Sequence, residues 1–177
     1  MTNSSLRTVK PDPAVDVLIE SDAWQVLPDA EDIVRRAIAS AATTGAATRD
    51  RRTELSVLLC DDKTIAGLNA RWRGQERPTN VLSFPAPPLR GAAPDEKVPL
   101  GDIAIAYETV VREAGEHGKA VSDHLSHLAV HGFLHLLGYD HHMDGEAEQM
   151  ERLERDILAR IGIADPYARH AACDAES

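Results

Sequence analysis

Residues 122–141, SDHLSHLAVHGFLHLLGYDH, decide the fold of this chain. Apolar residues recur there at helical spacing and occur on most faces of the predicted helix, as expected for a helix that packs on a sheet and is covered by its neighbours. Ser122 is a candidate for the N-cap. Gly138 predicts the end of the helix, because glycine readily adopts the left-handed conformation that terminates helices. The stretch therefore predicts a central helix.

Three histidines in this stretch are spaced as a single metal ion needs them. His131 and His135 are four residues apart, so on a helix both rings lie on one face, one turn from each other. The turn expected at Gly138 brings His141 back toward them, and the pattern reads H-x-x-x-H-x-x-G-x-x-H. Three His ligands with an open fourth position are typical of catalytic zinc. We therefore predict that His131, His135 and His141 bind one Zn²⁺ ion, and other divalent metals are compatible with the pattern.

The alternative is that His131 and His135 are ordinary helix residues whose rings bond to backbone carbonyls. Gly138 and the short return to His141 favour the metal site over this alternative. His142 competes with His141 for the place of third ligand, but the spacing favours His141.

The residue after the first histidine is informative because it is not acidic. In zinc peptidases with this spacing, that residue is a glutamate that acts as general base on the metal-bound water. Here the position is Gly132. The nearest acids in the sequence, Asp140, Asp144 and Glu146, have no comparable fixed place on the helix. The predicted metal site is therefore hydrolytic, but peptides are not its expected substrate.

The chain resembles a known family in three motifs. They are HGFLHLLGYDH (131–141), RGQERPTNVLSFP (73–85) and LGDIAI (100–105), and together they resemble the YbeY family of bacterial endoribonucleases, also called rRNA maturation factors. The resemblance runs in the same order from about Thr53 to Tyr167 and includes the closing DPY of residues 165–167.

The resemblance implies a metal-dependent, single-strand-specific endoribonuclease that occupies residues 1–177 as one domain. It implies a role in maturing the 3′ end of the small-subunit 16S rRNA and in ribosome quality control, with rRNA precursors and ribosomal particles or proteins as partners. It also marks Arg73 of the R-G motif as a catalytic residue. Physically, the positive fork of Arg73 can neutralise charge that builds on a phosphate, and a loop-capping arginine is the structural alternative.

Net charge argues against an RNA substrate, and its distribution softens the objection. At a formal charge of −10 the whole protein repels a polyanion. Arg71, Arg73 and Arg77, however, fall in a stretch whose single acid is Glu76, whereas residues 140–156 are rich in acids. We expect a local cationic patch beside the metal, with the acidic helix facing solvent or a basic partner. A solvated loop is the alternative for the arginines.

Length and composition predict one globular domain of 177 residues, 43% of them hydrophobic. The polar ends, 1–12 and 168–177, are expected to be flexible. No apolar run has the length of a signal peptide or a membrane span, so we expect a cytoplasmic protein without a membrane partner. Cys60 and Cys173 are expected to be reduced, without a disulfide-linked partner.

The fold class predicted is α+β: a roughly four-stranded sheet packed against helices, with the metal-binding helix at its centre. Strands are predicted over residues 15–26, 53–60, 79–84 and 102–106, the last as an edge pair with the third. Residues 85–99 are predicted to be a loop, and further helices are expected near residues 29–44, 62–73, 108–116 and 144–161.

Other polar residues are weaker candidates for a cleft beside the metal, because ordinary packing explains each of them as well. They are His124 and His127 on the central helix, Thr79, Asn80 and Ser83 in a motif-like strand, Asp102 at the start of another strand, and Asp140, which is placed to orient a ligating ring.

Three functions compete at this point. The first is a metal-dependent endoribonuclease, and the second is a zinc metallopeptidase-like hydrolase, which Gly132 disfavours. The third is a non-catalytic ribosome-assembly factor with a structural metal. The open coordination position argues against the third function, unless a ligand such as His142 closes the site.

Overall fold

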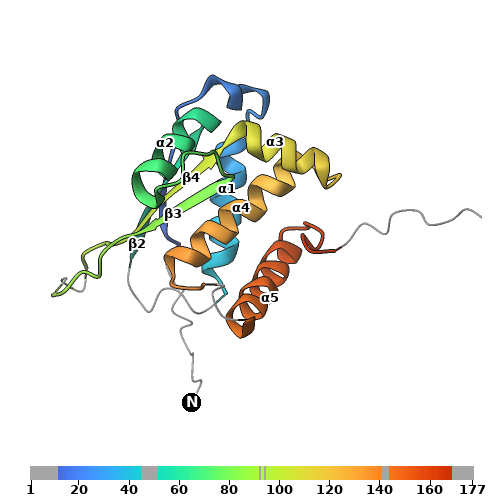
Figure 1. The fold of residues 1–177 in the computed structure, drawn as a ribbon. Helices are drawn as coiled ribbons and strands as arrows, with labels where there is room; N and C mark the ends of the chain where they lie inside the picture. The colour runs from blue at the N-terminus through green and yellow to red at the C-terminus, as the bar shows by residue number, and fades with distance from the viewer. Residues whose placement is uncertain (1–11, 45–51, 92, 94, 141–143, 169–177) are drawn as a thin grey trace, which may run out of the picture.

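The predicted strands and helices form a single α+β domain around one four-stranded sheet (Figure 1). The computed structural model describes residues 12–44, 52–91, 93, 95–140 and 144–168. In chain order the elements are β1 (Ala14–Ile19), the 3-10 helix η1 (Asp22–Val26), α1 (Ala30–Ala42), β2 (Thr53–Cys60), α2 (Asp62–Arg73), β3 (Val81–Pro85), β4 (Val98–Ala106), α3 (Tyr107–Glu116), α4 (Val121–Leu136) and α5 (Asp144–Arg160).

The sheet has the order β1-β2-β4-β3, in which β1, β2 and β4 are parallel and β3 is antiparallel to β4. The predicted pairing of the third and fourth strands is confirmed. The two strands form the pair at one edge of the sheet, but the predicted start of the fourth strand at Asp102 is wrong, because β4 starts at Val98. On its other side β4 pairs with β2. Pro99 made a strand unexpected here, because proline cannot donate a hydrogen bond to a neighbouring strand. The sheet accommodates Pro99 next to an irregularity in the register between Glu54 and Leu55 of β2.

The first predicted strand, residues 15–26, was also too long. β1 ends at Ile19, and the chain then turns into η1, where the Ser21 hydroxyl accepts a hydrogen bond from the Ala23 amide. This turn buries Trp24, whose indole N–H donates to the Cys60 carbonyl at 2.9 Å. Packing of Trp24 therefore overrides the strand propensity of its neighbours.

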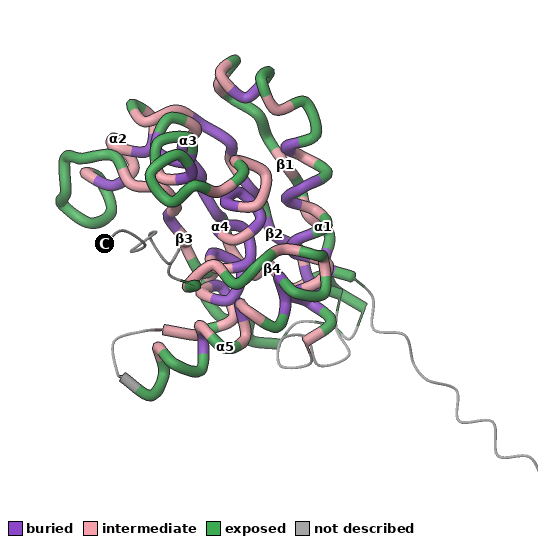
Figure 2. Tube along the Cα trace, turned by 90° about the vertical axis from the view of Figure 1, so that its right-hand side faces the viewer, coloured by how far each residue is buried: buried purple, intermediate pink, exposed green. Residues whose placement is uncertain are grey.

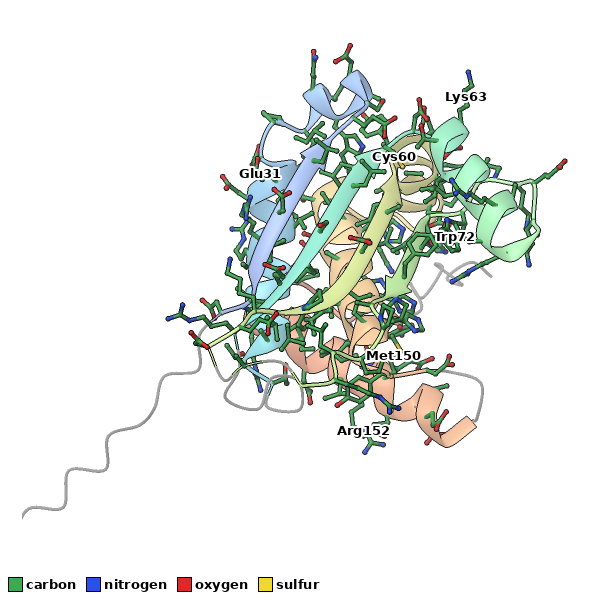
Figure 3. The ribbon with its side chains drawn as sticks, turned by 90° about the vertical axis from the view of Figure 1, so that its left-hand side faces the viewer. Glu31, Cys60, Lys63, Trp72, Met150 and Arg152 are labelled. Atoms are coloured by element: carbon green, nitrogen blue, oxygen red, sulfur yellow. The ribbon has the colours of Figure 1, made fainter. Side chains whose placement is uncertain are left out.

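Side chains alternate along the strands between two apolar layers. On one face Val57, Leu59 and Ile103 pack in the main core with α1, α4 and α5. On the other face Leu82 and Ala104 pack with Ile65 of α2 in a smaller cluster, and Figure 3 looks onto this second face, of which α2 covers one end. Buried residues concentrate in α4 and the inner strands, whereas α2 and α5 also turn exposed faces outward (Figure 2).

Helix α4 is central, as predicted, since it contacts β3, β4, α1, α3 and α5. Its N-cap is Ala120 and not Ser122, so that prediction is wrong by two residues. Its end is as predicted: Gly138 has φ +93°, and the Tyr139 amide donates back to the Leu134 carbonyl at 3.1 Å.

Gly132 lets α4 approach the sheet closely. The Ser83 hydroxyl donates to the Gly132 carbonyl at 3.2 Å, and a Cβ at position 132 would lie 3.0 Å from Ile103 Cγ2. The position therefore has no room for a longer side chain such as glutamate unless the strands move.

None of the helices within the described ranges is both long and apolar enough to cross a membrane. Residues 1–11 and 169–177, which make up most of the ends predicted to be flexible, lie outside the described ranges, as does Cys173. Cys60 is a free, buried thiol.

Candidate functional site

His131 and His135 project from the last two turns of α4 toward a common point. Their Nε2 atoms are 3.1 Å apart, and the ring planes meet at 77°. Two nitrogen ligands of a tetrahedral zinc ion, each about 2.0–2.1 Å from the metal, lie about 3.3 Å apart. The observed separation is close to that value, so the two residues fit a shared ion. The third predicted ligand, His141, lies outside the described residues, as does its competitor His142.

Glu154 of α5 orients the ring of His131. Its Oε1 atom lies 2.6 Å from His131 Nδ1, and its side chain is 0% exposed. Because an ionised carboxylate only accepts hydrogen bonds, His131 Nδ1 carries the proton and donates it. The Nε2 atom, which faces His135, is then left with the lone pair that a metal needs.

Two other contacts hold this carboxylate in place. The Tyr167 hydroxyl donates to Glu154 Oε2, and His127 Nε2 lies 3.3 Å from the same oxygen. Burial raises the pKa of Glu154, but hydrogen bonds from His127 and His131 outweigh burial and lower it to about 2. Glu154 is therefore ionised at neutral pH. Burial, together with the charge of Glu154, raises the pKa of the Tyr167 hydroxyl, which stays protonated as a donor.

Glu154 was predicted to lie on an acidic helix that faces solvent or a basic partner, and for this buried residue the prediction is wrong. Glu154 lies on the apolar stripe of α5, with buried Met150 one turn before it and buried Ile157 and Leu158 one turn after it. This helical spacing was visible in the sequence. An acid at the centre of an apolar stripe is expected to be buried, and a buried charge needs a partner. Here the partners are the histidines of α4.

His127, His131 and Glu154 form a group with the donor set of a metal site, since their ligand atoms lie within 4.8 Å of one another. The structure thus offers two candidate positions for an ion, on opposite sides of the His131 ring. One lies at Nδ1, beside Glu154, and the other lies at Nε2, beside His135. Between His131 Nδ1 and Glu154 the 2.6 Å separation is that of a direct hydrogen bond, shorter than the roughly 3.3 Å of two ligand atoms around one tetrahedral ion. The geometry therefore favours the Nε2 side.

His124 has a different task. It is buried, and its Nε2 lies 2.8 Å from the Glu113 carboxylate, which also accepts from Asn80 Nδ2 at 3.0 Å. Burial lowers the pKa of His124, and its contact with Glu113 opposes the shift. The residue connects α4, α3 and the start of β3 and does not reach the ring of His135.

A cleft of about 700 Å³ opens beside the two histidines. Its lining comes from the R-G motif, the edge strand and the end of α4, and consists of Arg73, Thr79, Asn80, Val81, Ser83, Pro85, His131, His135, Gly138, Tyr139 and Asp140. Thr79, Asn80, Ser83 and Asp140 thus lie where the sequence analysis suggested. Asp102 does not, because it is exposed on β4 and lines a separate hollow over β1 and β2.

The predicted cationic patch lies at one rim of this cleft. Arg71 and Arg73 form the last turn of α2, which ends at Gly74, and buried Asn69 ties the following turn down by donating to the Arg77 carbonyl at 2.8 Å. All three arginines are exposed, and none forms a salt bridge with a described residue. The charge of Arg73, which lines the cleft, is therefore available to an anion there.

Comparisons with known proteins agree on one family. The family described as Endoribonuclease YbeY matches residues 18–162. A protein of Rhodopseudomonas palustris (strain BisB18) named Endoribonuclease YbeY is 60% identical over 158 residues, which cover 88% of this chain and 93% of the relative. A Bradyrhizobium protein (strain BTAi1) of the same name is 54% identical over 167 residues, 93% of this chain and 98% of the relative. The solution structure of a Thermotoga maritima protein is 25% identical, covers 88% of this chain and 99% of that one, and has a TM-score of 0.43.

Proposed function

The chain belongs to the YbeY family of endoribonucleases, and from this premise we propose that it cleaves RNA with a metal ion held by His131, His135 and His141. The observation that carries the proposal is the pair of Nε2 atoms 3.1 Å apart at the wall of a cleft that Arg73 also lines. A metal site and a cation that no described acid pairs with thus face the same cleft.

The described residues have separate tasks in this reaction. His131, His135 and His141 would hold Zn²⁺, which would supply hydroxide near neutral pH and polarise a phosphoryl oxygen. Glu154 keeps the His131 ring in the tautomer and orientation that binding requires. Arg73 at the rim attracts the phosphodiester and neutralises charge that builds on it. Thr79, Asn80 and Ser83 line the cleft wall with polar groups for sugar and phosphate oxygens.

Two alternatives are less well supported. A glutamate base of the peptidase kind would need the position of Gly132, where even a Cβ would approach Ile103 Cγ2 to 3.0 Å. A purely structural metal is disfavoured because the His131/His135 pair borders an open cleft among the described residues.

The family resemblance also supports a more specific role, which is part of the proposal. We propose that residues 1–177 act as one domain on single-stranded RNA, that the substrate is the precursor of the 16S rRNA near its 3′ end, and that the protein takes part in ribosome quality control. Ribosomal particles or proteins are then its partners, and the cytoplasm, where ribosomes assemble, is its place of action.

The test combines metal analysis with cleavage of a 16S rRNA precursor by wild type and three variants. His135→Ala should lose both metal and cleavage, because one of the converging nitrogens is removed. Arg73→Ala should keep its metal and lose cleavage. Arg152→Ala, an exposed arginine of α5 away from the cleft, is the matched control and should keep both (Figure 3).

Full RNA cleavage by metal-free protein would overturn the proposal. Cleavage of casein but not of RNA would instead support the peptidase. A fully ligated metal without either activity would support the structural role. Wild-type activity of Arg73→Ala would remove Arg73 from the mechanism.

A further inference from the structure

An aromatic side chain stands in solvent next to Arg73, a residue of the cleft wall. Trp72, in the last turn of α2, is 62% exposed, whereas the other tryptophan, Trp24, is 1% exposed in the core. Exposure of a tryptophan to this extent leaves a large apolar surface in contact with water. The fold does not need it there, because the smaller apolar cluster under α2 is closed by Ile65, Leu68 and Phe84.

The Trp72 ring is held in place and still accessible. Its centroid lies 5.8 Å from that of Phe84, at an interplanar angle of 55°, and Phe84 is anchored in the cluster below. The Arg71 guanidinium lies 5.6 Å from the centroid of the Trp72 ring. Figure 3 shows Trp72 beside the edge strand β3. A ring that is oriented before binding loses little entropy when a ligand stacks on it.

The ring is connected to the cleft wall through its neighbour in the chain. Trp72 directly precedes Arg73, which lines the cleft, while the ring itself packs on Phe84 of the edge strand β3, on the side of the sheet that α2 covers. Arg71, Arg73 and Arg77 around it are exposed and unpaired by any described acid. Although the whole chain has a net charge of −10, an exposed aromatic ring and positive charges occur together in this segment.

We infer that Trp72 is a stacking platform for an unpaired base of the RNA strand that enters the cleft. Stacking on aromatic side chains flanked by arginines is the general way in which proteins bind single-stranded RNA, because every base has a π-face and every linkage a negative charge. A paired base inside a duplex has no free face to offer. The platform thus gives the proposed endoribonuclease function, on which this inference rests, a physical source of preference for single strands.

Fluorescence offers a direct test, because Trp72 and Trp24 are the chain's two tryptophans. In a zinc-loaded Trp24→Phe protein, Trp72 is the remaining emitter. A short single-stranded RNA should quench it within the mixing time of a stopped-flow instrument, before cleavage. An abasic strand of the same length should bind more weakly and leave the emission unchanged.

Affinity gives a second readout. Trp72→Ala should weaken binding of single-stranded RNA roughly 5- to 100-fold, and Trp72→Phe should restore most of it, since one stacked base has about this effect. Leu18→Ala, at a side chain that is also 62% exposed but on β1, is the control and should bind as wild type. Zinc affinity and thermal stability should be unchanged in all three variants.

The outcomes separate the two proposals. If wild type cleaves RNA but Trp72 is not quenched and Trp72→Ala binds normally, the stacking platform is overturned and the endoribonuclease function stands. If Trp72→Ala binds RNA normally but loses a ribosomal protein in pull-down, the surface is a protein-docking site and the inference is overturned. If Trp72→Ala does not fold, the fluorescence quenching of the intact Trp72 and the RNA affinity of Trp72→Phe still test the stacking platform. Absence of cleavage by wild type refutes the proposed function by itself.

Discussion

Replacing Glu154 with glutamine should weaken zinc binding while leaving the ligands in place. The substitution keeps the shape of the side chain and removes its charge. The amide carbonyl can still accept the hydrogen bond from His131 Nδ1, but the contact is no longer charge-assisted. Glu154 is not one of the proposed metal ligands. The variant should therefore bind the metal less tightly but should not lose it.

The magnitude follows from the 2.6 Å contact between His131 and Glu154, whose side chain is 0% exposed. Hydrogen bonds to charged groups contribute about 1.5–3 kcal/mol and neutral ones about 0.5–1.5 kcal/mol. The difference, about 1.4 kcal/mol, corresponds to roughly a tenfold increase in the zinc dissociation constant. Glu154→Leu leaves the buried His131 Nδ1–H without an acceptor and should raise the constant by roughly 100-fold.

Competition with a chromophoric zinc chelator measures these constants, and the visible absorption spectrum of the cobalt-loaded protein reports whether the coordination changes. Glu151→Gln is the matched control, since it makes the same chemical change three residues earlier on α5 in a side chain that is 43% exposed. Its zinc affinity should equal that of wild type. Thermal unfolding of the metal-free variants separates loss of affinity from loss of fold.

Two results would refute this reasoning. If Glu154→Gln binds zinc as tightly as wild type, the contact with His131 does not prepare the site. If Glu154→Gln and His127→Asn both abolish binding while His135→Ala retains it, the ion lies in the group formed by His127, His131 and Glu154, and the assignment of the Nε2 side is wrong.

Three further predictions concern the fold. Gly132→Ala should lower the free energy of unfolding by about 1–3 kcal/mol, because its Cβ would approach a core side chain to 3.0 Å; an unchanged denaturation midpoint would contradict the close approach of α4 to the sheet. Gly101→Ala should be more harmful, since φ is +132° and the added Cβ would lie 2.1 Å from the Phe84 carbonyl oxygen; folding with wild-type stability would show that the strands meet differently. Burial, reinforced by nearby carboxylates, raises the pKa of Cys60 to about 12, so in a Cys173→Ser protein Ellman's reagent at pH 8 should find no reactive thiol until denaturant is added; rapid labelling of the native protein would place Cys60 at the surface.

Local periodicity was sufficient for the elements whose residues agree with one another. The helix that carries His131 and His135, its end at Gly138 and the strand of residues 53–60 were all predicted correctly, because apolar spacing and glycine conformation act within a few residues. Prediction failed where packing competes with local preference. At Trp24 a buried ring turned a predicted strand into a 3-10 helix, and at Pro99 pairing with Glu54 of β2 extended a strand into a predicted loop.

By itself the sequence determined the histidine spacing on α4, the glycine in place of a peptidase base, and the arginine-rich turn after α2. Only the tertiary structure decided that Arg73 lines the same cleft as His131, that Glu154 is buried against the His131 ring, and that Trp72, the neighbour of Arg73, is exposed. The physical reason is the distance along the chain over which each interaction acts. Spacing along one helix is set by its own geometry, whereas the partner of a buried charge and the neighbours of a cleft depend on how distant segments pack.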